Sequence, residues 1–498
     1  MDVLTPGAAP VPLVDASSSQ RRWLVGLLLF ALAVRVATLG AYPLMDNTEA
    51  RYAEIARKIV ETGDWVMPQF KYGVPFWSKP PLSMWMTAVS YLAFGISEFA
   101  ARLASLVACL PVAWMTYRLA AVREGTDDGL RAAVVLVTTP LFFVSAGAVM
   151  TDPALVLGTT LSMAGFWFAM TQTGAAARAW GYAFFVGLAI GLLAKGPVGV
   201  VLTLAPVGLW TLWKGGIRNV WRRLPWISGL LLTIALAVPW YVLAERRTPG
   251  FIDYFLVGEH WKRYTESGWK GDMFGTAHKQ PRGMIWPMAL LFTLPWSGLW
   301  LIQFRHFRFA AARRESTRPD DGWVAYLWLW MMTPIVFFTF AGNILFTYFL
   351  PGVPAFALLV ARGWSAIAVP SRREALLRYS GLDTPVVVVL LVLFVLPRLA
   401  PMYSHRALVS EYLAQRASDR ERLVYLHEAP QSAEFYARGK VTTVEGAGGL
   451  DPYLADGIRN FFALTEDQLK DTVVERRDLE PLGRFGRYTL YAEKTGAP

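Results

Sequence analysis

Repeated apolar runs of membrane-spanning length constrain this chain more than any other feature of its sequence. Of its 498 residues, 54% are hydrophobic. About 20 apolar residues in helical form cross the hydrocarbon layer of a bilayer. The pattern therefore predicts a mostly α-helical, polytopic transmembrane bundle, with candidate spans at roughly residues 23–44, 99–121, 131–149, 153–171, 179–196, 197–213, 224–244, 283–304, 323–342, 345–362 and 383–401.

Basic residues between these spans predict the orientation of the bundle. With the N-terminus inside and eleven spans, short loops such as 214–223 and 305–318 carry clustered Lys and Arg, as cytoplasmic loops do. The apolar stretch 80–96 opens with Pro80-Pro81, and we expect it on the membrane surface. The total is then about 11 to 13 spans, and two long loops, about 45–82 and 245–282, share the opposite face with the C-terminal tail.

Three regions follow from this pattern. Residues 1–20 are polar and rich in small residues and proline, and we expect a disordered cytoplasmic tail. Residues 21–401 form the transmembrane domain. Residues 402–498 contain strand-like segments at 423–426 and 487–492 and helix-like segments at 432–438 and 466–474, which predicts a small α/β domain.

Composition and missing motifs exclude several classes of function. The net charge of +11 is explained by basic cytoplasmic loops. A nucleic-acid partner is not expected, because the sequence shows no soluble basic domain that would bind one. The single cysteine, Cys109, excludes a disulfide within the chain. The sequence contains neither a Walker loop nor a dinucleotide fingerprint in a βαβ unit. We therefore expect a substrate that reaches the protein already activated, through the bilayer.

The first long loop begins with polar residues at helical spacing. Residues 47–62 predict an amphipathic helix with Tyr52 and Ile55 on its apolar side. Glu54 and Lys58 are expected on the opposite, solvent-facing side. Asp46 and Glu49 resemble a capping box, with Asp46 as the N-cap. A cap residue at the positive helix end stays ionised, and an ionised carboxylate facing a membrane-side cleft can also accept a proton from an attacking hydroxyl.

Other charged residues stand at predicted breaks between apolar segments. Lys79 precedes a double proline, so that it is presented on a stiff turn, where it can face a phosphate or reach lipid headgroups. Asp152 either caps the span that begins near Pro153 or faces the same site. Lys195 interrupts an apolar run, a costly position for a cation unless it faces a cavity or the surface.

The second long loop and a late span add further candidates. His260 and His278 do not form a compact ligand set, so we expect hydrogen bonding near the site from His260 and assign no metal ligand. A divalent metal stays possible, and no other cofactor is expected. Tyr348 lines a cavity or belongs to the aromatic belt at the membrane surface.

Several of these segments together resemble a known family. The segments that carry the resemblance are Asp46–Glu54, Gly63-Asp64-Trp65, the run from Gly73 to Leu82, Glu98–Leu103, Thr151-Asp152-Pro153, Ala194–Pro197, Glu259-His260, Gln280-Pro281-Arg282, Leu294-Pro295-Trp296 and Tyr348–Pro351. Through them the chain resembles bacterial membrane glycosyltransferases of the GT-C fold. That family includes protein O-mannosyltransferases and the lipid A aminoarabinose transferase. The resemblance spans nearly the whole chain, and the first-loop motif is its most specific part.

The resemblance implies inverting transfer of a sugar from a polyprenyl-phosphate carrier to an acceptor hydroxyl. It implies a first-loop acid as the base, which makes Asp46 the first choice and Glu49 the second. Many relatives carry the acid where this chain has Thr48, and the aminoarabinose transferases commonly carry Glu where it has Ser78. The implied site comprises catalytic Asp46, Glu49 and Asp152, phosphate-binding Lys79, Arg51, Lys195 and Arg282, and cavity-lining Tyr52, His260 and Tyr348.

The resemblance also implies a location and partners. The expected protein is a multi-pass enzyme of the bacterial inner membrane, with its active site and C-terminal domain in the periplasm. Its partners are a polyprenyl-phosphate-linked sugar, membrane lipids and an acceptor that is lipid A, another glycolipid, a glycan or a protein. A transporter or flippase of lipid-linked sugars is the alternative, although polar residues concentrated on one side favour chemistry at one face.

Overall fold

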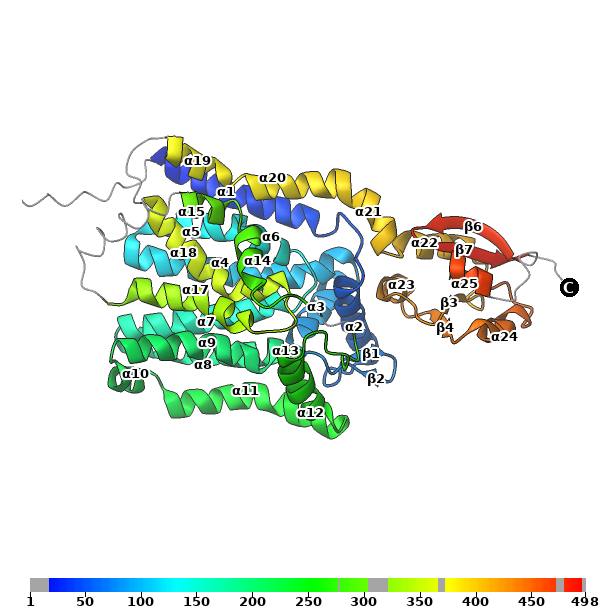
Figure 1. The fold of residues 1–498 in the computed structure, drawn as a ribbon, viewed down its shortest axis with the longest axis horizontal. Coiled ribbons are helices and arrows are strands. Elements are labelled where there is room, and N and C mark those ends of the chain that lie inside the picture. The colour runs from blue at the N-terminus through cyan, green and yellow to red at the C-terminus, as the bar shows by residue number, and fades with distance from the viewer. Residues whose placement is uncertain (1–17, 276–277, 303–320, 366–371, 472–478, 495–498) are drawn as a thin grey trace, which may run out of the picture.

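The computed structural model describes residues 18–275, 278–302, 321–365, 372–471 and 479–494. Long helices lie side by side along the long axis of the molecule, and a small sheet domain follows them at one end (Figure 1). The first part contains α1 (Ser18–Thr38), α2 (Thr48–Thr62), β1 (Gln69–Lys71), β2 (Val74–Pro75), α3 (Leu82–Phe94), α4 (Glu98–Glu124), α5 (Thr126–Thr138), α6 (Pro140–Ser145), α7 (Asp152–Thr171), α8 (Gly174–Lys195), α9 (Pro197–Trp213), α10 (Ile217–Arg223) and α11 (Trp226–Arg247).

The second part of the bundle contains more broken helices. It comprises α12 (Phe251–Asp253), the π-helix η1 (Tyr254–Lys262), α13 (Arg263–Thr265), α14 (Ile285–Phe292), α15 (Trp296–Ile302), α17 (Trp323–Thr339), the 3-10 helix η2 (Phe346–Gly352), α18 (Val353–Ser365), α19 (Arg372–Ser380), α20 (Asp383–Leu390), the π-helix η3 (Leu391–Val395) and α21 (Leu396–Tyr403).

The helices confirm a multi-pass membrane protein with fewer full-length spans than expected. Among the described residues, six helices are long and apolar enough to cross a membrane: Glu98–Glu124, Asp152–Thr171, Gly174–Lys195, Trp226–Arg247, Phe346–Trp364 and Ala375–Tyr403. A seventh span results if α14 and α15, which meet at 99°, are counted together. The described helices that meet the length and composition criteria for a membrane span are therefore fewer than the 11 to 13 spans expected from the sequence.

The missing spans have local causes. The expected span 131–149 breaks at Pro140 into α5 and α6, because proline cannot donate a helical hydrogen bond. Helices α9 and α17 are apolar but shorter than the other spans. Helix α1 carries three arginines and is not among the six.

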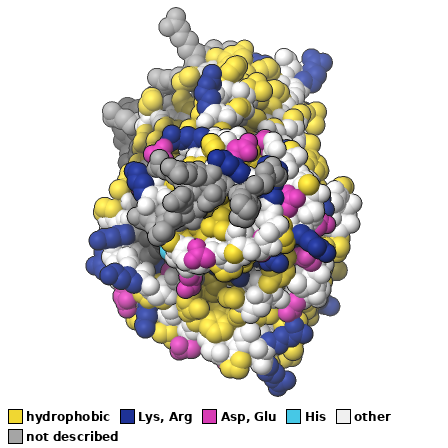
Figure 2. Space-filling view, turned by 90° about the vertical axis from the view of Figure 1, so that its right-hand side faces the viewer, with side chains coloured by type: hydrophobic (Ala, Val, Ile, Leu, Met, Phe, Trp, Pro, Cys, Tyr) yellow, Lys and Arg dark blue, Asp and Glu magenta, His cyan; other side chains and the backbone are white. Residues whose placement is uncertain are grey.

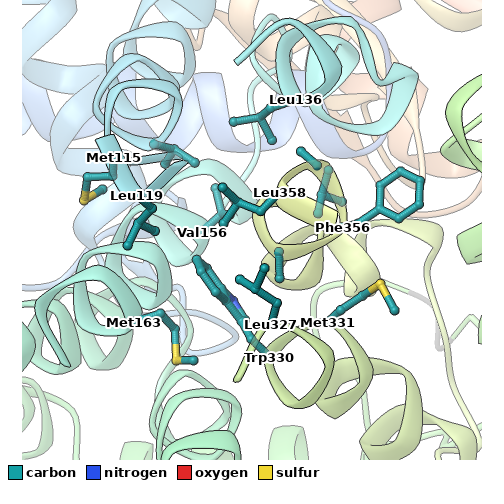
Figure 3. Close-up of a cluster of buried hydrophobic side chains, with 14 of the residues drawn as sticks. Met115, Leu119, Leu136, Val156, Met163, Leu327, Trp330, Met331, Phe356 and Leu358 are labelled. Carbon is teal, nitrogen blue, oxygen red and sulfur yellow. The ribbon is translucent and has the colours of Figure 1, made fainter. Parts of the chain in front are cut away.

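A continuous apolar core joins the central helices. Met115 and Leu119 of α4 and Val156 of α7 face Leu327 of α17 and Leu358 of α18, and all five side chains are buried or nearly so (Figure 3). Large aromatic side chains such as Trp330 fill the same layer. Because close-packed interiors resist displacement, this core holds the ends of α7, α8 and α9 in fixed positions.

The C-terminal domain confirms the predicted small mixed α/β fold. It contains α22 (Arg406–Gln415), β3 (Leu423–Leu426), α23 (Gln431–Tyr436), β4 (Val441–Val444), η4 (Ala447–Leu450), α24 (Asp451–Leu454), β5 (Phe461–Thr465), α25 (Glu466–Asp471), β6 (Leu479–Phe485) and β7 (Tyr488–Glu493). The strand order is β4-β3-β5-β7-β6, in which β3 pairs in parallel with β4 and β5, and β7 pairs antiparallel with β5 and β6.

Helix α2 differs from its expected amphipathic pattern. Tyr52 and Ile55 are buried as predicted, but Glu54 and Lys58, expected on the solvent side, are also fully buried. Helix α23 covers this polar face, and the Nζ atom of Lys58 donates to Glu434 at 2.9 Å. The sheet domain therefore packs directly on the first long loop. The face of the molecule at this end carries acidic and basic side chains interspersed with apolar ones (Figure 2).

Candidate functional site

A cavity of about 380 Å³ lies where the beginning of α7, the α8–α9 junction, η1 and the segment before η2 meet. Its polar end presents Lys79, Asp152, Lys195, Glu259 and Arg263. The rest of its wall is largely apolar and comprises Leu155, Pro197, Val198, Val201, Leu202, Leu256, Trp261, Tyr264, Phe337, Phe338 and Ala341, with His260, Asn343 and Tyr348 completing it. One cavity thus combines a cluster of charged side chains with a largely apolar wall, which suits an amphiphilic ligand.

An ion-pair chain crosses the charged end. The Nζ atom of Lys79 lies 2.6 Å from Oε2 of Glu259. Arg263, one helical turn after Glu259, lies 3.2 Å from the same carboxylate and 2.9 Å from Asp272. The Glu259 side chain is completely buried. Burial raises the pKa of Glu259, but Lys79 and Arg263 outweigh it and lower the pKa to about 2, so this carboxylate is ionised at neutral pH.

A second ion pair joins the first residue of α7 to the last residue of α8. The Nζ atom of Lys195 donates to Oδ1 of Asp152 at 2.7 Å and lies 5.2 Å from the ring centre of Tyr348. Asp152 is the first residue of α7, with Thr151 before it as the N-cap. The second oxygen of Asp152 accepts no hydrogen bond from a described residue. Asp152 therefore keeps one acceptor available within the cavity.

The α8–α9 junction depends on a glycine. Gly196 has φ +72, a conformation that residues with a side chain rarely adopt. A Cβ atom added there would lie 2.6 Å from the Phe255 ring and 3.2 Å from His260. His260 fits this corner with Nε2 3.0 Å from the Lys195 carbonyl oxygen and Nδ1 2.8 Å from the Phe255 carbonyl oxygen. Burial lowers the pKa of His260, and its ring serves to fix the junction.

Five residues named from the sequence line this cavity, and five do not. Lys79, Asp152, Lys195, His260 and Tyr348 come together there. The residues outside the lining are Asp46, Glu49, Arg51, Tyr52 and Arg282.

The structure corrects the expected surroundings of Asp46. The N-cap of α2 is Asn47, without a side-chain capping bond, so the capping box is wrong. Asp46 accepts hydrogen bonds from the backbone N–H and the hydroxyl of Ser432 in α23. Burial raises the pKa of Asp46 more than these bonds lower it, whereas a cap position would have lowered it. Its role as a base stays a prediction that no contact in the cavity supports.

The other four residues have structural partners or solvent around them. Glu49 pairs with Arg102 at 2.9 Å and accepts from the backbone N–H of Val149. Arg51 donates to the Phe274 carbonyl. Tyr52 packs edge-on against the Phe76 ring, and Arg282 is exposed. Their predicted roles in catalysis and phosphate binding stay predictions.

Sequence reasoning missed Arg263, and it noted Glu259 without assigning it a role. Both lie in the second long loop, which carries no apolar periodicity. Their spacing of four residues places them on one helix face, and π-helical turns such as η1 are frequent at functional sites. Only the four-residue spacing was present in the sequence as a signal for the pair, because the π-helical turn is seen only in the structure. Within the described ranges, no three His, Cys, Asp or Glu side chains are grouped to hold a metal ion.

Comparisons with known proteins agree with this fold. Residues 22–255 match the family profile described as dolichyl-phosphate-mannose-protein mannosyltransferase. The chain is 28% identical over 354 residues to an undecaprenyl phosphate-alpha-4-amino-4-deoxy-L-arabinose arabinosyl transferase of Pseudomonas fluorescens, covering 70% of this chain and 59% of that protein. It is 30% identical to a similarly named protein of Sodalis glossinidius, covering 68% and 59%. The chain thus spans about three-fifths of the length of these relatives.

Solved structures support the same architecture. ArnT from Cupriavidus metallidurans bound to undecaprenyl phosphate aligns with a TM-score of 0.76 at 21% identity, over 97% of this chain and 100% of that one. The oligosaccharyltransferase AglB of Archaeoglobus fulgidus aligns with a TM-score of 0.52 at 11% identity, over 97% and 75%. The resemblance found in the sequence is confirmed.

Proposed function

Since this chain is homologous to the PMT family of GT-C membrane glycosyltransferases, we propose that it transfers a sugar from a polyprenyl-phosphate carrier to an acceptor hydroxyl, with inversion at the anomeric carbon. The observation that carries this proposal is the meeting of Lys79, Lys195 and Arg263 at one end of an otherwise apolar cavity. The apolar wall would hold the first isoprenoid units and the cations would hold the phosphate.

The charge of the cavity supports a phosphodiester donor. Three lining cations face two lining carboxylates, Asp152 and Glu259, which leaves one net positive charge. A sugar phosphodiester carries one negative charge, which neutralises the net positive charge of the lining. The product, a prenyl monophosphate, carries nearly two negative charges at neutral pH, so the lining favours the phosphate as its charge grows in the transition state.

The proposed reaction breaks the bond between the anomeric carbon and the phosphate oxygen and forms a bond from that carbon to the acceptor oxygen. The acceptor proton passes to a carboxylate. Asp152 is the better base in this cavity, because Glu259 binds Lys79 and Arg263 while Asp152 has an unoccupied acceptor oxygen. Lys195, drawn toward the donor phosphate, would release the other oxygen of Asp152.

The proposed location is the bacterial inner membrane, with the cavity and the C-terminal domain on the periplasmic face. The names of the relatives suggest 4-amino-4-deoxy-L-arabinose on undecaprenyl phosphate as the first donor to assay. Lipid A, another glycolipid, a glycan and a protein are the acceptors to compare. Ser78 stands where the aminoarabinose transferases commonly carry Glu, so the assay should include other polyprenyl-phosphate sugars.

The test compares Asp152→Asn with Asp46→Asn in purified full-length protein given undecaprenyl-phosphate sugar and acceptor. We expect Asp152→Asn to lower turnover about 100-fold or more while donor binding persists, as loss of a general base does. Asp46→Asn should keep turnover within a few-fold. Loss of turnover in Asp46→Asn, with Asp152→Asn active, would restore Asp46 as the base. Movement of carrier lipid across vesicles without glycoside formation would favour the flippase.

A further inference from the structure

A second hollow, of about 600 Å³, is lined in part by α10. Figure 1 shows α10 at the end of the bundle opposite the sheet domain. The hollow is enclosed by the α7–α8 turn and the α10–α11 turn. Its lining includes Thr173, Arg178, Tyr182, Arg222 and Arg223. It shares no lining residue with the donor cavity.

The hollow is strongly electropositive. None of the described residues that line it is acidic, and the sequence contains no Asp or Glu between Asp152 and Glu245. Helix α8, 22 residues long, begins in the hollow, and its N-cap Thr173 makes no side-chain capping bond. The positive end of a long helix therefore adds to the arginine charges.

The three arginines have different roles. Arg223 donates to the Gln172 carbonyl oxygen at 2.8 Å and to that of Ala169 at 3.3 Å, so it ties the two turns together. Arg178 and Arg222 are exposed, and neither has a hydrogen bond or ion pair to another described residue. Two cations thus line the hollow without a hydrogen-bond or ion-pair partner among the described residues.

The surroundings of the hollow are those of a membrane surface. Trp221 and Trp226 stack with ring centres 5.5 Å apart, and Trp221 is largely exposed, as in an interfacial aromatic belt. Helix α11 leaves the hollow with an exposed apolar face that includes Leu230, Leu231 and Ile234. A ligand with a negative headgroup and acyl chains can place its headgroup in the basic hollow and its chains along the apolar face of α11.

We propose that this hollow binds the headgroup of an anionic phospholipid, with the phosphate between Arg178 and Arg222 at the start of α8 and the acyl chains along α11. Basic pockets between membrane helices are suited to such headgroups. The proposal is independent of the transferase reaction, because the hollow lies at the other end of the bundle.

The test uses full-length protein reconstituted in vesicles of equal parts phosphatidylglycerol and phosphatidylcholine and released for native mass spectrometry. We expect one retained phosphatidylglycerol in preference to phosphatidylcholine. The double variant Arg178→Gln/Arg222→Gln should lower its occupancy at least fivefold, since one basic residue near an anionic lipid surface is worth about a fivefold change in binding. Arg218→Gln, on the same helix as Arg222 but outside the lining, is the matched control and should retain the lipid.

Three outcomes would overturn the proposal. Equal retention of both lipids by the unmodified protein would show that the hollow does not select charge. An equal loss in Arg218→Gln and in the double variant would show a diffuse surface effect. Displacement of the lipid by millimolar inorganic phosphate would identify a site for free phosphate instead. The first and third outcomes are measured on the unmodified protein. The proposal can therefore be refuted even if the variants fold poorly.

Discussion

The Nζ atom of Lys79 lies 2.6 Å from the carboxylate of Glu259, although 180 positions separate the two residues in the sequence. This contact joins the first long loop to the second at the charged end of the cavity. Because Arg263 shares the same carboxylate, Glu259 balances two cations that would otherwise repel each other. The Lys79–Glu259 pair therefore sets how strongly the cavity attracts a phosphate.

Replacing Glu259 with Gln should destabilise the empty protein and increase its response to prenyl phosphate. Removing one partner of a buried ion pair costs about 3 kcal/mol, because the remaining charge stays buried without compensation. A bound phosphate would supply that compensation. Thermal unfolding in detergent, with and without undecaprenyl phosphate, measures both effects.

The matched control is Glu266→Gln, an exposed acid seven positions later in the same loop. It should leave stability and the response to ligand unchanged. A Glu259→Gln protein that is as stable as the unmodified one, and no more responsive to undecaprenyl phosphate, would contradict the balancing role.

Gly196→Ala should disrupt the α8–α9 junction and lower transfer activity. The residue has φ +72, and a Cβ atom would meet the Phe255 ring at 2.6 Å. We expect a loss of about 1 to 3 kcal/mol in stability, together with displacement of His260 and Lys195. Gly208→Ala is the control in α9, where a Cβ atom would meet nothing within 4 Å. Unfolding and transfer assays on both variants test this difference, and similar behaviour of the two would contradict it.

Asp46 and Ser432 should show energetic coupling in a double-mutant cycle. Both oxygens of Asp46 accept hydrogen bonds from Ser432, so Asp46→Asn and Ser432→Ala remove parts of the same contact. We expect a coupling energy of about 1 to 3 kcal/mol, measured as protection of the C-terminal domain from limited proteolysis. Additive effects would show that Asp46 does not hold this domain.

The stability of the C-terminal domain should fall in acid because of His405, whose ring packs against Tyr425 and Tyr488 of that domain. Burial, together with Arg487, lowers the pKa of His405 from its ordinary 6.5 to about 4. The unfolded chain therefore binds a proton between pH 6.5 and 4 that the folded chain does not, and stability falls as the pH falls through this range. We expect a loss of about 3 kcal/mol in chemical unfolding followed at several pH values.

His405→Gln should remove most of that dependence. Asp46, whose pKa is raised by burial, contributes with the opposite sign, since its stabilising effect is lost as the pH rises above its folded pKa. A pH profile unchanged by His405→Gln would assign the dependence to other groups.

Much of the site could be predicted because its residues stand at helix ends that the sequence reveals. Asp152 precedes a proline at the start of an apolar run, and Lys195 precedes Gly196-Pro197 at the end of another. Their ion pair follows from two neighbouring helices that end at the same level. The strand Leu423–Leu426 was likewise predicted at its observed position, because its apolar run is compact.

The remaining features depend on contacts between distant segments. Lys58 looks like a solvent-facing residue of α2 until α23 covers it. The partner of Asp46 lies 386 positions away, and no local pattern indicates it. Full-length spans were overcounted because hydrophobicity alone reveals neither the 99° bend between α14 and α15 nor where apolar helices such as α9 and α17 end.

The packing of α23 on α2 has a consequence for biosynthesis. A ribosome makes the segment around Asp46 and Lys58 well before Ser432 and Glu434, its later partners. Until the C-terminal domain is synthesised, that segment exposes charged side chains that are buried in the folded protein. It also exposes the apolar surface against which Phe435 later packs. Nascent chains stalled before α23 should therefore be targets for chaperones or quality-control proteases, even with every membrane helix already inserted.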